Sequence, residues 1–200
     1  VPSYAEWLDG QDARPAYDDL VQILQSLQWQ DPSRKGKSWV LKTPGHLMAL
    51  DTVLDVFPDA KIVMTHRDPV STVPSYCSME ASLYKMGSDD ITNPMIGEYW
   101  QERLANWLER FMAARDAAGR ARFIDVAYTS LLENPVEEGL RVLSETGIPM
   151  TDNMQNNMSE WIDANKREHR AAHKYTLEDF GLSASGINEV FAAYKQAYLA

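Results

Sequence analysis

The feature that most constrains the fold is an alternation of short apolar, β-branched runs with longer helical patterns. The runs extend from Ser38 to Lys42 (SWVLK), from Ala60 to Thr65 (AKIVMT) and from Arg122 to Ala127 (RFIDVA). Runs of this length and content are typical of strands. Because helical patterns separate them, we expect parallel strands joined by crossover helices. The sequence therefore predicts an α/β fold of three layers, in which helices flank a parallel sheet.

The rest of the chain carries apolar residues at helical spacing. In the longest pattern, apolar and aromatic positions recur at intervals of three and four, which favours core packing over an acceptor pocket. No repeat or low-complexity tract interrupts the chain, so we expect one domain over residues 1–200. The predicted helices are Tyr17 to Trp29, Leu47 to Val56, Pro69 to Lys85, Met95 to Ala118, Leu131 to Glu145, Asn153 to Lys166 and Ile187 to Leu199.

Composition narrows the class of protein. The chain has 200 residues, 44% of them apolar, and a formal net charge of −10. This charge disfavours non-specific binding to nucleic acid or to an anionic bilayer. No run approaches the roughly 18 consecutive apolar residues of a membrane span, and the single cysteine, Cys77, cannot form an internal disulfide. We therefore expect a soluble, cytoplasmic protein with no transmembrane segment and no nucleic-acid partner.

Polar and cationic side chains follow each predicted strand. Thr43-Pro44-Gly45-His46 follows the first run, His66-Arg67-Asp68-Pro69 the second, and Tyr128-Thr129-Ser130 the third. In an open parallel sheet, ligands bind beyond the carboxyl ends of the strands, where helix N-termini present unpaired amides. The sequence therefore predicts an anion-binding site at this edge of the sheet.

A phosphate-binding P-loop at Gly36-Lys37-Ser38 is excluded. That pattern requires a glycine five residues before Gly36, where this chain has Asp31. It also requires a strand before the loop and a helix after it, whereas here the predicted strand comes after the tripeptide.

Arg67 is the best-placed residue for holding an anion. Asp68 and Pro69 suit the N-cap and first position of the following helix, on which Ser75 also lies. A guanidinium beside a hydroxyl and helix-terminal amides is a good phosphate site. The alternative is that Arg67 only pairs with Asp68 or another neighbour. His66 precedes Arg67 on the strand and faces the opposite side, so it is interpreted as structural.

Taken together, these segments resemble the sulfotransferases that use 3′-phosphoadenosine 5′-phosphosulfate (PAPS). The spacing of eight residues between Arg67 and Ser75, at a strand-to-helix junction, is the most specific part of the resemblance. The resemblance covers residues 1–182, and its last segment is similar to the C-terminal signature of a bacterial branch. The segments that carry it are Lys42 to His46, Phe57 to Pro69, Tyr128 to Pro135 and His173 to Leu182.

The resemblance implies a P-loop nucleotide-kinase-like sulfotransferase fold and a site for the donor nucleotide. Arg67 and Ser75 would bind the 3′-phosphate, and Tyr128 would lie against the adenine. The further candidates, for closing over the nucleotide phosphates, are Arg170, His173 and Lys174.

The resemblance also implies two catalytic residues. Lys42 occupies the position of a family lysine near the sulfuryl group, where an ammonium stabilises charge on the transferring group and the leaving phosphate. His46 is the predicted base that takes the proton from an acceptor hydroxyl. Its place in the first turn of a helix beginning near Gly45 favours the neutral imidazole that a base requires. This scheme needs no metal ion.

The chain departs from the family pattern at its N-terminus. The family fold begins with a strand and a phosphosulfate-binding loop rich in Gly, Arg, Ser and Thr, and nothing before Ser38 resembles them. The segment from Val1 to Leu8 instead resembles the middle of such proteins. We therefore expect the C-terminal portion of a sulfotransferase-like domain, incomplete at its N-terminus and lacking a cradle for the 5′-phosphosulfate.

The implied activity is transfer of a sulfuryl group from PAPS to the hydroxyl or amine of a small-molecule or glycolipid-type acceptor. Two alternatives stay open at this point. A nucleotide or small-molecule kinase of the same architecture fits the alternating strands and the basic strand ends, and it would need a phosphate loop and magnesium. A non-catalytic, truncated nucleotide-binding or interaction domain fits the missing loop.

Overall fold

The computed structural model describes residues 2–165 and 174–199. The chain divides into two compact units, which are described one at a time. Unit 1 comprises Val1–Ala60 and Arg110–Arg122, and unit 2 comprises Lys61–Glu109 and Phe123–Ala200. Across the described ranges, none of the helices combines the length and apolar character that crossing a bilayer requires.

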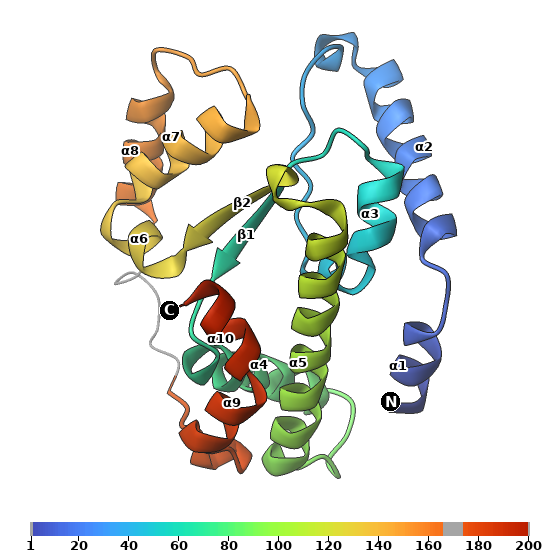
Figure 1. The fold of residues 1–200 in the computed structure, drawn as a ribbon, viewed down its shortest axis with the longest axis vertical. Coiled ribbons are helices and arrows are strands. Elements are labelled where there is room, and N and C mark those ends of the chain that lie inside the picture. The colour runs from blue at the N-terminus through green and yellow to red at the C-terminus, as the bar shows by residue number, and fades with distance from the viewer. Residues whose placement is uncertain (1, 166–173, 200) are drawn as a thin grey trace. The chain divides into compact units, whose positions relative to one another are not determined.

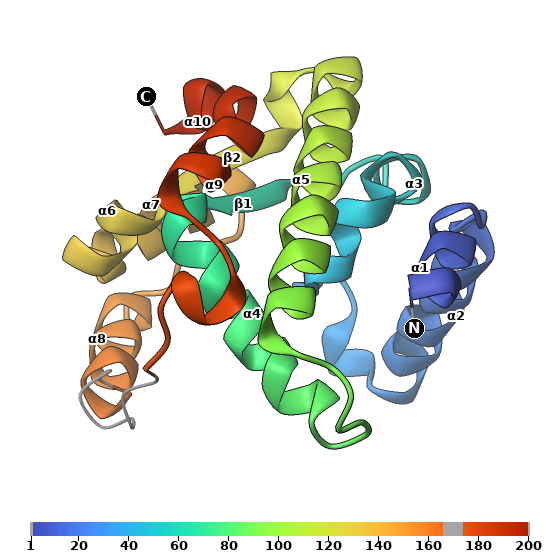
Figure 2. The ribbon, with the colours of Figure 1, turned by 90° about the horizontal axis from the view of Figure 1, so that it is seen from below.

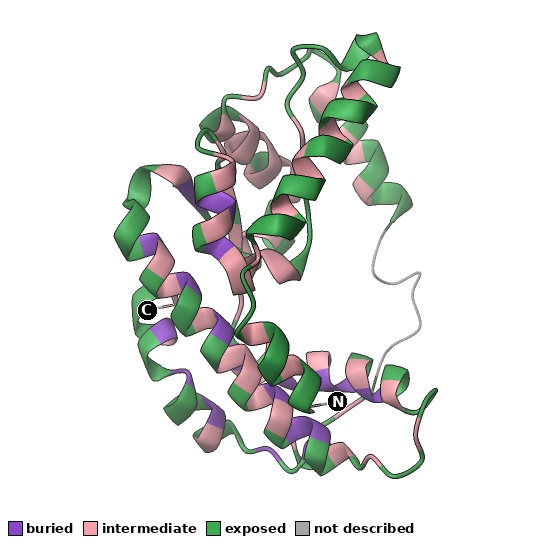
Figure 3. Cartoon of the chain, turned by 90° about the vertical axis from the view of Figure 1, so that its right-hand side faces the viewer, coloured by how far each residue is buried: buried purple, intermediate pink, exposed green. Residues whose placement is uncertain are grey.

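The described part of unit 1 is helical. Leu50, Val53 and Leu54 are buried in it, as is Phe111 of the long helix α5, whose last residues belong to this unit. Figure 3 marks the buried positions along the helices in purple. The elements of unit 1 are α1 (Pro2–Asp9), α2 (Arg14–Gln30), η1 (Pro32–Arg34), η2 (Pro44–Ala49), α3 (Leu50–Val56), the end of α5 (Asn93–Ala118) and η3 (Arg120–Arg122) (Figure 1).

The guanidinium of Arg122 stabilises the end of α3 and the turn that follows it through hydrogen bonds. It donates hydrogen bonds to the backbone carbonyls of Leu54, Phe57 and Ala60, at 3.1, 2.6 and 3.2 Å. Carbonyls at a helix C-terminus have no partner within the helix, and a cation is a favourable donor to them. Arg122 therefore fixes the path of the chain as it leaves α3.

The predicted strand from Ser38 to Lys42 does not form. The segment is irregular between η1 and η2, and within the described residues its backbone joins no ladder. The side chain of Val40 is 79% exposed. An apolar, β-branched run becomes a strand only where a neighbouring strand pairs with its backbone, and composition alone does not reveal that pairing. This strand prediction is wrong.

Unit 2 contains the parallel sheet. Strands β1 (Ile62–His66) and β2 (Phe123–Ala127) pair in a register that runs from Ile62↔Phe123 to His66↔Ala127. Figure 1 shows the two arrows side by side and pointing the same way. The strands predicted from Ala60 and from Arg122 are confirmed to within two residues at each end, and with them the expected α/β class.

Helices pack around this sheet. Residues of α4 and α9 lie side by side, as Figure 2 shows, and Cys77 of α4 is fully buried (Figure 2). The helices of unit 2 in the described residues are α4 (Pro69–Tyr84), the beginning of α5, α6 (Tyr128–Glu133), α7 (Pro135–Thr146), α8 (Met154–Ala164), η5 (Glu178–Phe180), α9 (Ala184–Val190) and α10 (Ala192–Tyr198).

Two predicted helices are each broken into two α-helices, and a third, Leu47 to Val56, is divided between the end of η2 and α3. The pattern from Leu131 to Glu145 forms α6 and α7, because Pro135 has no N–H to continue the first helix and is suited to start the second. The pattern from Ile187 to Leu199 forms α9 and α10, which meet at the buried Phe191. Helical spacing persists across both breaks, so the periodicity alone did not show them.

Candidate active site

Arg67 and Tyr128 meet at the carboxyl end of the sheet. His66 of β1 pairs with Ala127 of β2, so Arg67 and Tyr128 are the next residues of their chains at the same level. The guanidinium carbon of Arg67 lies 4.6 Å from the ring centroid of Tyr128, within the range of a cation–π contact. Both side chains are half-buried. The structure thus brings together two of the residues predicted to bind the nucleotide.

The Arg67 guanidinium is not neutralised by Asp68. The Asp68 carboxylate instead accepts from the backbone N–H of Val70 at 2.9 Å, as the N-cap of α4, and from Nζ of Lys195 at 3.1 Å. Within residues 2–165 and 174–199, no carboxylate pairs with Arg67. Its N–H groups are therefore available to an anion, and this donor set suits a phosphate.

Ser75 lies in the second turn of α4, half-buried. The Asp68 cap and Pro69 in the first turn start the helix as the sequence predicted, and the helix continues through the buried Pro74. In the part of the chain that the structure describes, no hydrogen-bond partner is found for the Ser75 hydroxyl. The hydroxyl is therefore available as a donor near the start of the helix that Arg67 precedes.

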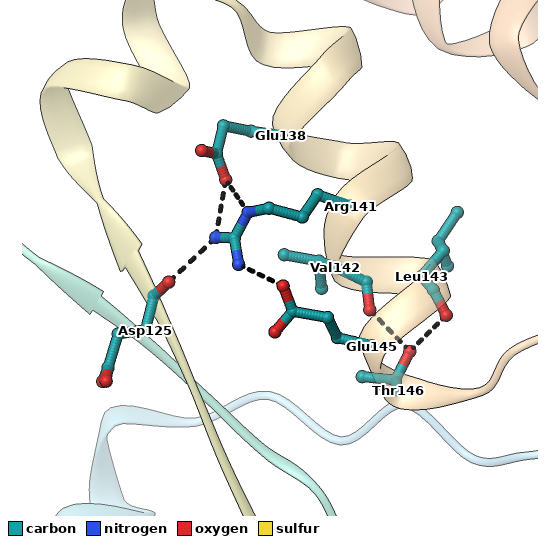
Figure 4. A network of polar contacts seen from close by, with 7 residues as sticks. All are labelled: Asp125, Glu138, Arg141, Val142, Leu143, Glu145 and Thr146. Atoms are coloured by element: carbon teal, nitrogen blue, oxygen red, sulfur yellow. Dashed lines mark hydrogen bonds and ion pairs between the residues drawn. The ribbon is translucent and has the colours of Figure 1, made fainter.

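Arg141 of α7 is hydrogen-bonded to β2, the strand that leads to Tyr128. One terminal nitrogen of Arg141 donates to the Asp125 carbonyl of β2 at 2.8 Å and to Glu138 at 2.7 Å (Figure 4). Its other terminal nitrogen donates to Glu145 at 2.7 Å. Hydrogen bonds to Glu138 and Glu145 raise the pKa of Arg141. Since this cation links α7 to the backbone of β2 three residues before Tyr128, it limits movement of the strand end.

His46, in unit 1, is held by a tyrosine. Thr43 caps η2 by accepting from the Gly45 N–H at 3.2 Å, which places His46 in the first turn. Its Nδ1 lies 2.8 Å from the Tyr17 hydroxyl. Burial lowers the pKa of His46 because desolvation disfavours the imidazolium, and burial raises the pKa of Tyr17. The imidazole is therefore neutral near pH 7, with Nδ1 engaged and Nε2 left for other chemistry.

Sequence reasoning missed Tyr17. It falls at the start of a predicted helix, where an aromatic residue is an ordinary core position, and nothing in the pattern links it to a residue 29 positions later. The helix α2 in fact starts three residues earlier, at Arg14.

The remaining predicted site residues are placed as follows. Lys42 is exposed in the irregular segment just before Thr43, and no ion pair to it is found among the described residues. Lys174 is exposed at the start of the second described range. Arg170 and His173 lie outside the described residues. Lys42 and His46 belong to unit 1, whereas Arg67, Ser75, Tyr128 and Lys174 belong to unit 2.

The sequence is similar to proteins of one family. A model of the sulfotransferase family matches residues 1–152. Among curated proteins, the omega-hydroxy-beta-dihydromenaquinone-9 sulfotransferase Stf3 of Mycobacterium bovis is 24% identical over 154 residues, which is 74% of this chain and 38% of that protein. The protein of the same name from Mycobacterium tuberculosis matches to the same extent.

Solved structures show the same fold. Sulfotransferase STF9 from Mycobacterium avium superposes with a TM-score of 0.87 at 25% identity, over 99% of this chain and 50% of that one. Sulfotransferase STF1 from M. tuberculosis gives a TM-score of 0.82 at 33% identity, over 96% of this chain and 49% of that one. The expected three-layer α/β fold is thereby confirmed. The chain spans about half the length of these solved relatives and 38% of the curated ones.

Proposed function

Because the chain belongs to the sulfotransferase family, we propose that the protein transfers a sulfuryl group from PAPS to the hydroxyl or amine of an acceptor. The observation that carries the proposal is the Arg67–Tyr128 pair at the carboxyl end of the parallel sheet. A guanidinium without a carboxylate partner, beside an aromatic ring, suits a ligand that joins a phosphate to a purine.

The nucleotide site belongs to unit 2. Arg67 and the Ser75 hydroxyl bind the 3′-phosphate, and the adenine packs against Tyr128. The exposed Lys174 is a further cation for the nucleotide phosphates. Arg170 and His173, which complete the set predicted from the sequence, are assigned the same role.

The transfer is a displacement at sulfur. The acceptor oxygen or nitrogen attacks the sulfur of PAPS, the bond from sulfur to the 5′-phosphate oxygen breaks, and adenosine 3′,5′-bisphosphate (PAP) leaves. The acceptor's proton goes to Nε2 of His46, the nitrogen that the Tyr17 contact leaves available. The ammonium of Lys42 stabilises the charge that develops on the sulfuryl group and on the departing phosphate.

The acceptor functional group is best assigned as a hydroxyl. The curated relatives are named for an omega-hydroxy compound, and we carry over only that functional group. A half-buried, neutral imidazole suits deprotonation of a hydroxyl because it needs no further proton loss before it accepts one. Within the class of small-molecule or glycolipid-type acceptors, a lipid-like alcohol is the first compound to assay.

Calorimetry with PAP tests the nucleotide site in the full-length protein. Arg67→Ala should weaken PAP binding by about 2–4 kcal/mol, the range for a charge-assisted pair. Arg120→Ala, which removes an exposed arginine of η3 that no described carboxylate pairs, is the matched control and should bind normally. Unchanged affinity in Arg67→Ala would contradict the assignment.

Donor preference distinguishes the activity from its rivals. We expect sulfuryl transfer with PAPS that persists when a chelator is present. Turnover with ATP that is lost on chelation would instead support a kinase. PAP binding with no turnover of any acceptor would support the non-catalytic alternative.

A further inference from the structure

The two residues that flank Arg67 are both bound by the C-terminal helix. His66 and Asp68 contact consecutive residues of α10, Tyr194 and Lys195, which lie more than 120 positions later in the chain. All five residues belong to unit 2. Figure 1 shows α10 at the tip of the β1 arrow, where the strand gives way to Arg67.

At His66, the last residue of β1, the contact consists of two consecutive hydrogen bonds to a buried ring. The His66 side chain is only 3% exposed, with Nδ1 2.9 Å from the Tyr194 hydroxyl and Nε2 2.8 Å from Oδ1 of Asp125. Its ring also stacks on Tyr198 of α10 at a centroid distance of 4.5 Å and an interplanar angle of 4°. His66 is therefore fixed in position and in ring orientation by β2 on one side and by α10 on the other.

The chemistry of the donor and acceptor groups determines which group donates in the hydrogen bond between His66 and Asp125. A carboxylate only accepts, so the Nε2–H of His66 donates to Asp125, while Nδ1 of the same ring lies at hydrogen-bond distance from the Tyr194 hydroxyl. Burial raises the pKa of Tyr194 well above its ordinary value, which keeps the hydroxyl protonated. The same hydroxyl also interacts with the backbone of Arg67. Tyr194 thus acts on the backbone at Arg67 chiefly through the preceding residue, His66.

On the helix side, the contact is an ion pair. Nζ of Lys195 lies 3.1 and 3.3 Å from the two carboxylate oxygens of Asp68, and 2.7 Å from the side-chain oxygen of Asn188 on α9. Because Asp68 is also the N-cap of α4, Lys195 holds the first turn of the helix that carries Ser75. The main chain of Arg67 is thus fixed on both sides by α10.

The segment that carries α10 is itself anchored. Phe191, where α9 meets α10, is 2% exposed, and Ile187 is fully buried. Further upstream, η5 packs against α5 so closely that a Cβ at Gly97 would lie 2.1 Å from the Phe180 carbonyl oxygen. A helix held this firmly can position a neighbouring backbone, whereas a loosely attached one cannot.

We propose that Tyr194 and Lys195 are positioning residues for the donor nucleotide, because α10 holds the backbone of Arg67 where its guanidinium meets the 3′-phosphate. The inference rests on the nucleotide-binding role proposed above for Arg67. Arg67 has no carboxylate partner of its own among the described residues. Its placement therefore depends on how firmly the backbone beneath it is held, and small displacements of a binding group are costly.

The test compares two ligands that differ only in the 3′-phosphate, PAP and adenosine 5′-monophosphate (AMP), by calorimetry on the full-length protein. Tyr194→Phe retains the ring and removes the hydroxyl, and we expect PAP binding to weaken about 3- to 10-fold with AMP binding unchanged. Lys195→Gln should act in the same way. Lys85→Gln makes the same charge change at the opposite end of α4 and should leave both ligands unaffected.

The combined variant shows whether the effect passes through Arg67. In an Arg67→Ala background, Tyr194→Phe should produce no further loss of PAP affinity. Equal weakening of PAP and AMP in Tyr194→Phe and Lys195→Gln would indicate a general structural role and would overturn the inference. The inference alone would also fail if Arg67→Ala abolished the preference for PAP while both α10 variants kept it. An unaltered protein with no preference for PAP would overturn the nucleotide-binding role of Arg67 and the inference with it.

Discussion

His46 acts, in our proposal, through its neutral form, and the structure fixes the direction of its titration. Burial lowers the pKa of His46, and the neutral imidazole is present above that pKa. We therefore expect kcat/KM to rise with pH and to level off with an apparent pKa below the ordinary value of about 6.5. His46→Ala should abolish this inflection and lower kcat by about 10²- to 10⁴-fold. The same inflection in His46→Ala would assign it to another group.

Tyr17 holds Nδ1 of His46, and the proposed base function requires the tautomer in which Nδ1 carries the proton. When Nδ1–H donates to the Tyr17 oxygen, Nε2 keeps the lone pair that accepts the acceptor's proton. Tyr17→Phe keeps the ring contact and removes the hydroxyl, so kcat should fall about 2- to 10-fold, the value of one net hydrogen bond, with the KM for PAPS unchanged. Steady-state kinetics measure both. Tyr4→Phe alters an exposed tyrosine of α1 and serves as the control.

At the scale of elements, Arg122 stabilises the end of α3, and its loss should lower the stability of the fold. Its guanidinium serves three carbonyls at the end of α3, and hydrogen bonds from a charged group are stronger than neutral ones. We expect Arg122→Ala to lower the free energy of unfolding by about 2–3 kcal/mol, measured by urea denaturation. Arg120→Ala, two residues away and exposed, should change it by less than about 0.5 kcal/mol. Equal effects of the two substitutions would show that the carbonyl contacts add nothing.

The sequence predicted elements where local information determines them. β1 and β2 carry their apolar character in their own residues, and the Asp68–Pro69 start of α4 is a local capping signal. The segment from Ser38 to Lys42 has the same apolar, β-branched character but no strand bonded to it in the described residues, and pairing is a property of two segments.

The residues of the candidate site also fall into those that local sequence predicts and those that it does not. The sequence placed Arg67 and Tyr128 at strand ends, and parallel register then accounts for their contact. It gave no indication of Tyr17 or Tyr194, because each reaches its histidine from a distant part of the chain. His66 was interpreted as structural, and its hydrogen-bonded burial agrees with that interpretation. Supporting residues are set by packing between elements, which one sequence does not reveal.

At the scale of the whole molecule, the division into two units separates the proposed roles. The described residues assigned to the nucleotide lie in unit 2, whereas the proposed base and its tyrosine lie in unit 1. PAP lacks the sulfuryl group and the acceptor, so in unit 1 the one proposed contact that it retains is the contact of its 5′-phosphate with Lys42. Nucleotide binding should therefore be observable as a change confined to particular segments of the chain.

Amide hydrogen exchange with and without PAP tests this directly. At about 100 times its Kd, a ligand that binds only the folded state contributes about 2.7 kcal/mol of stability. We expect exchange to slow most at the end of β1, in the first turns of α4 and in α6, which Tyr128 begins, and to slow least in α2. The protection at β1 and α4 should be smaller with AMP, because Arg67 and Ser75 then lack the phosphate they bind. Protection in α2 with none at the end of β1 or in the first turns of α4 would contradict a site built on Arg67.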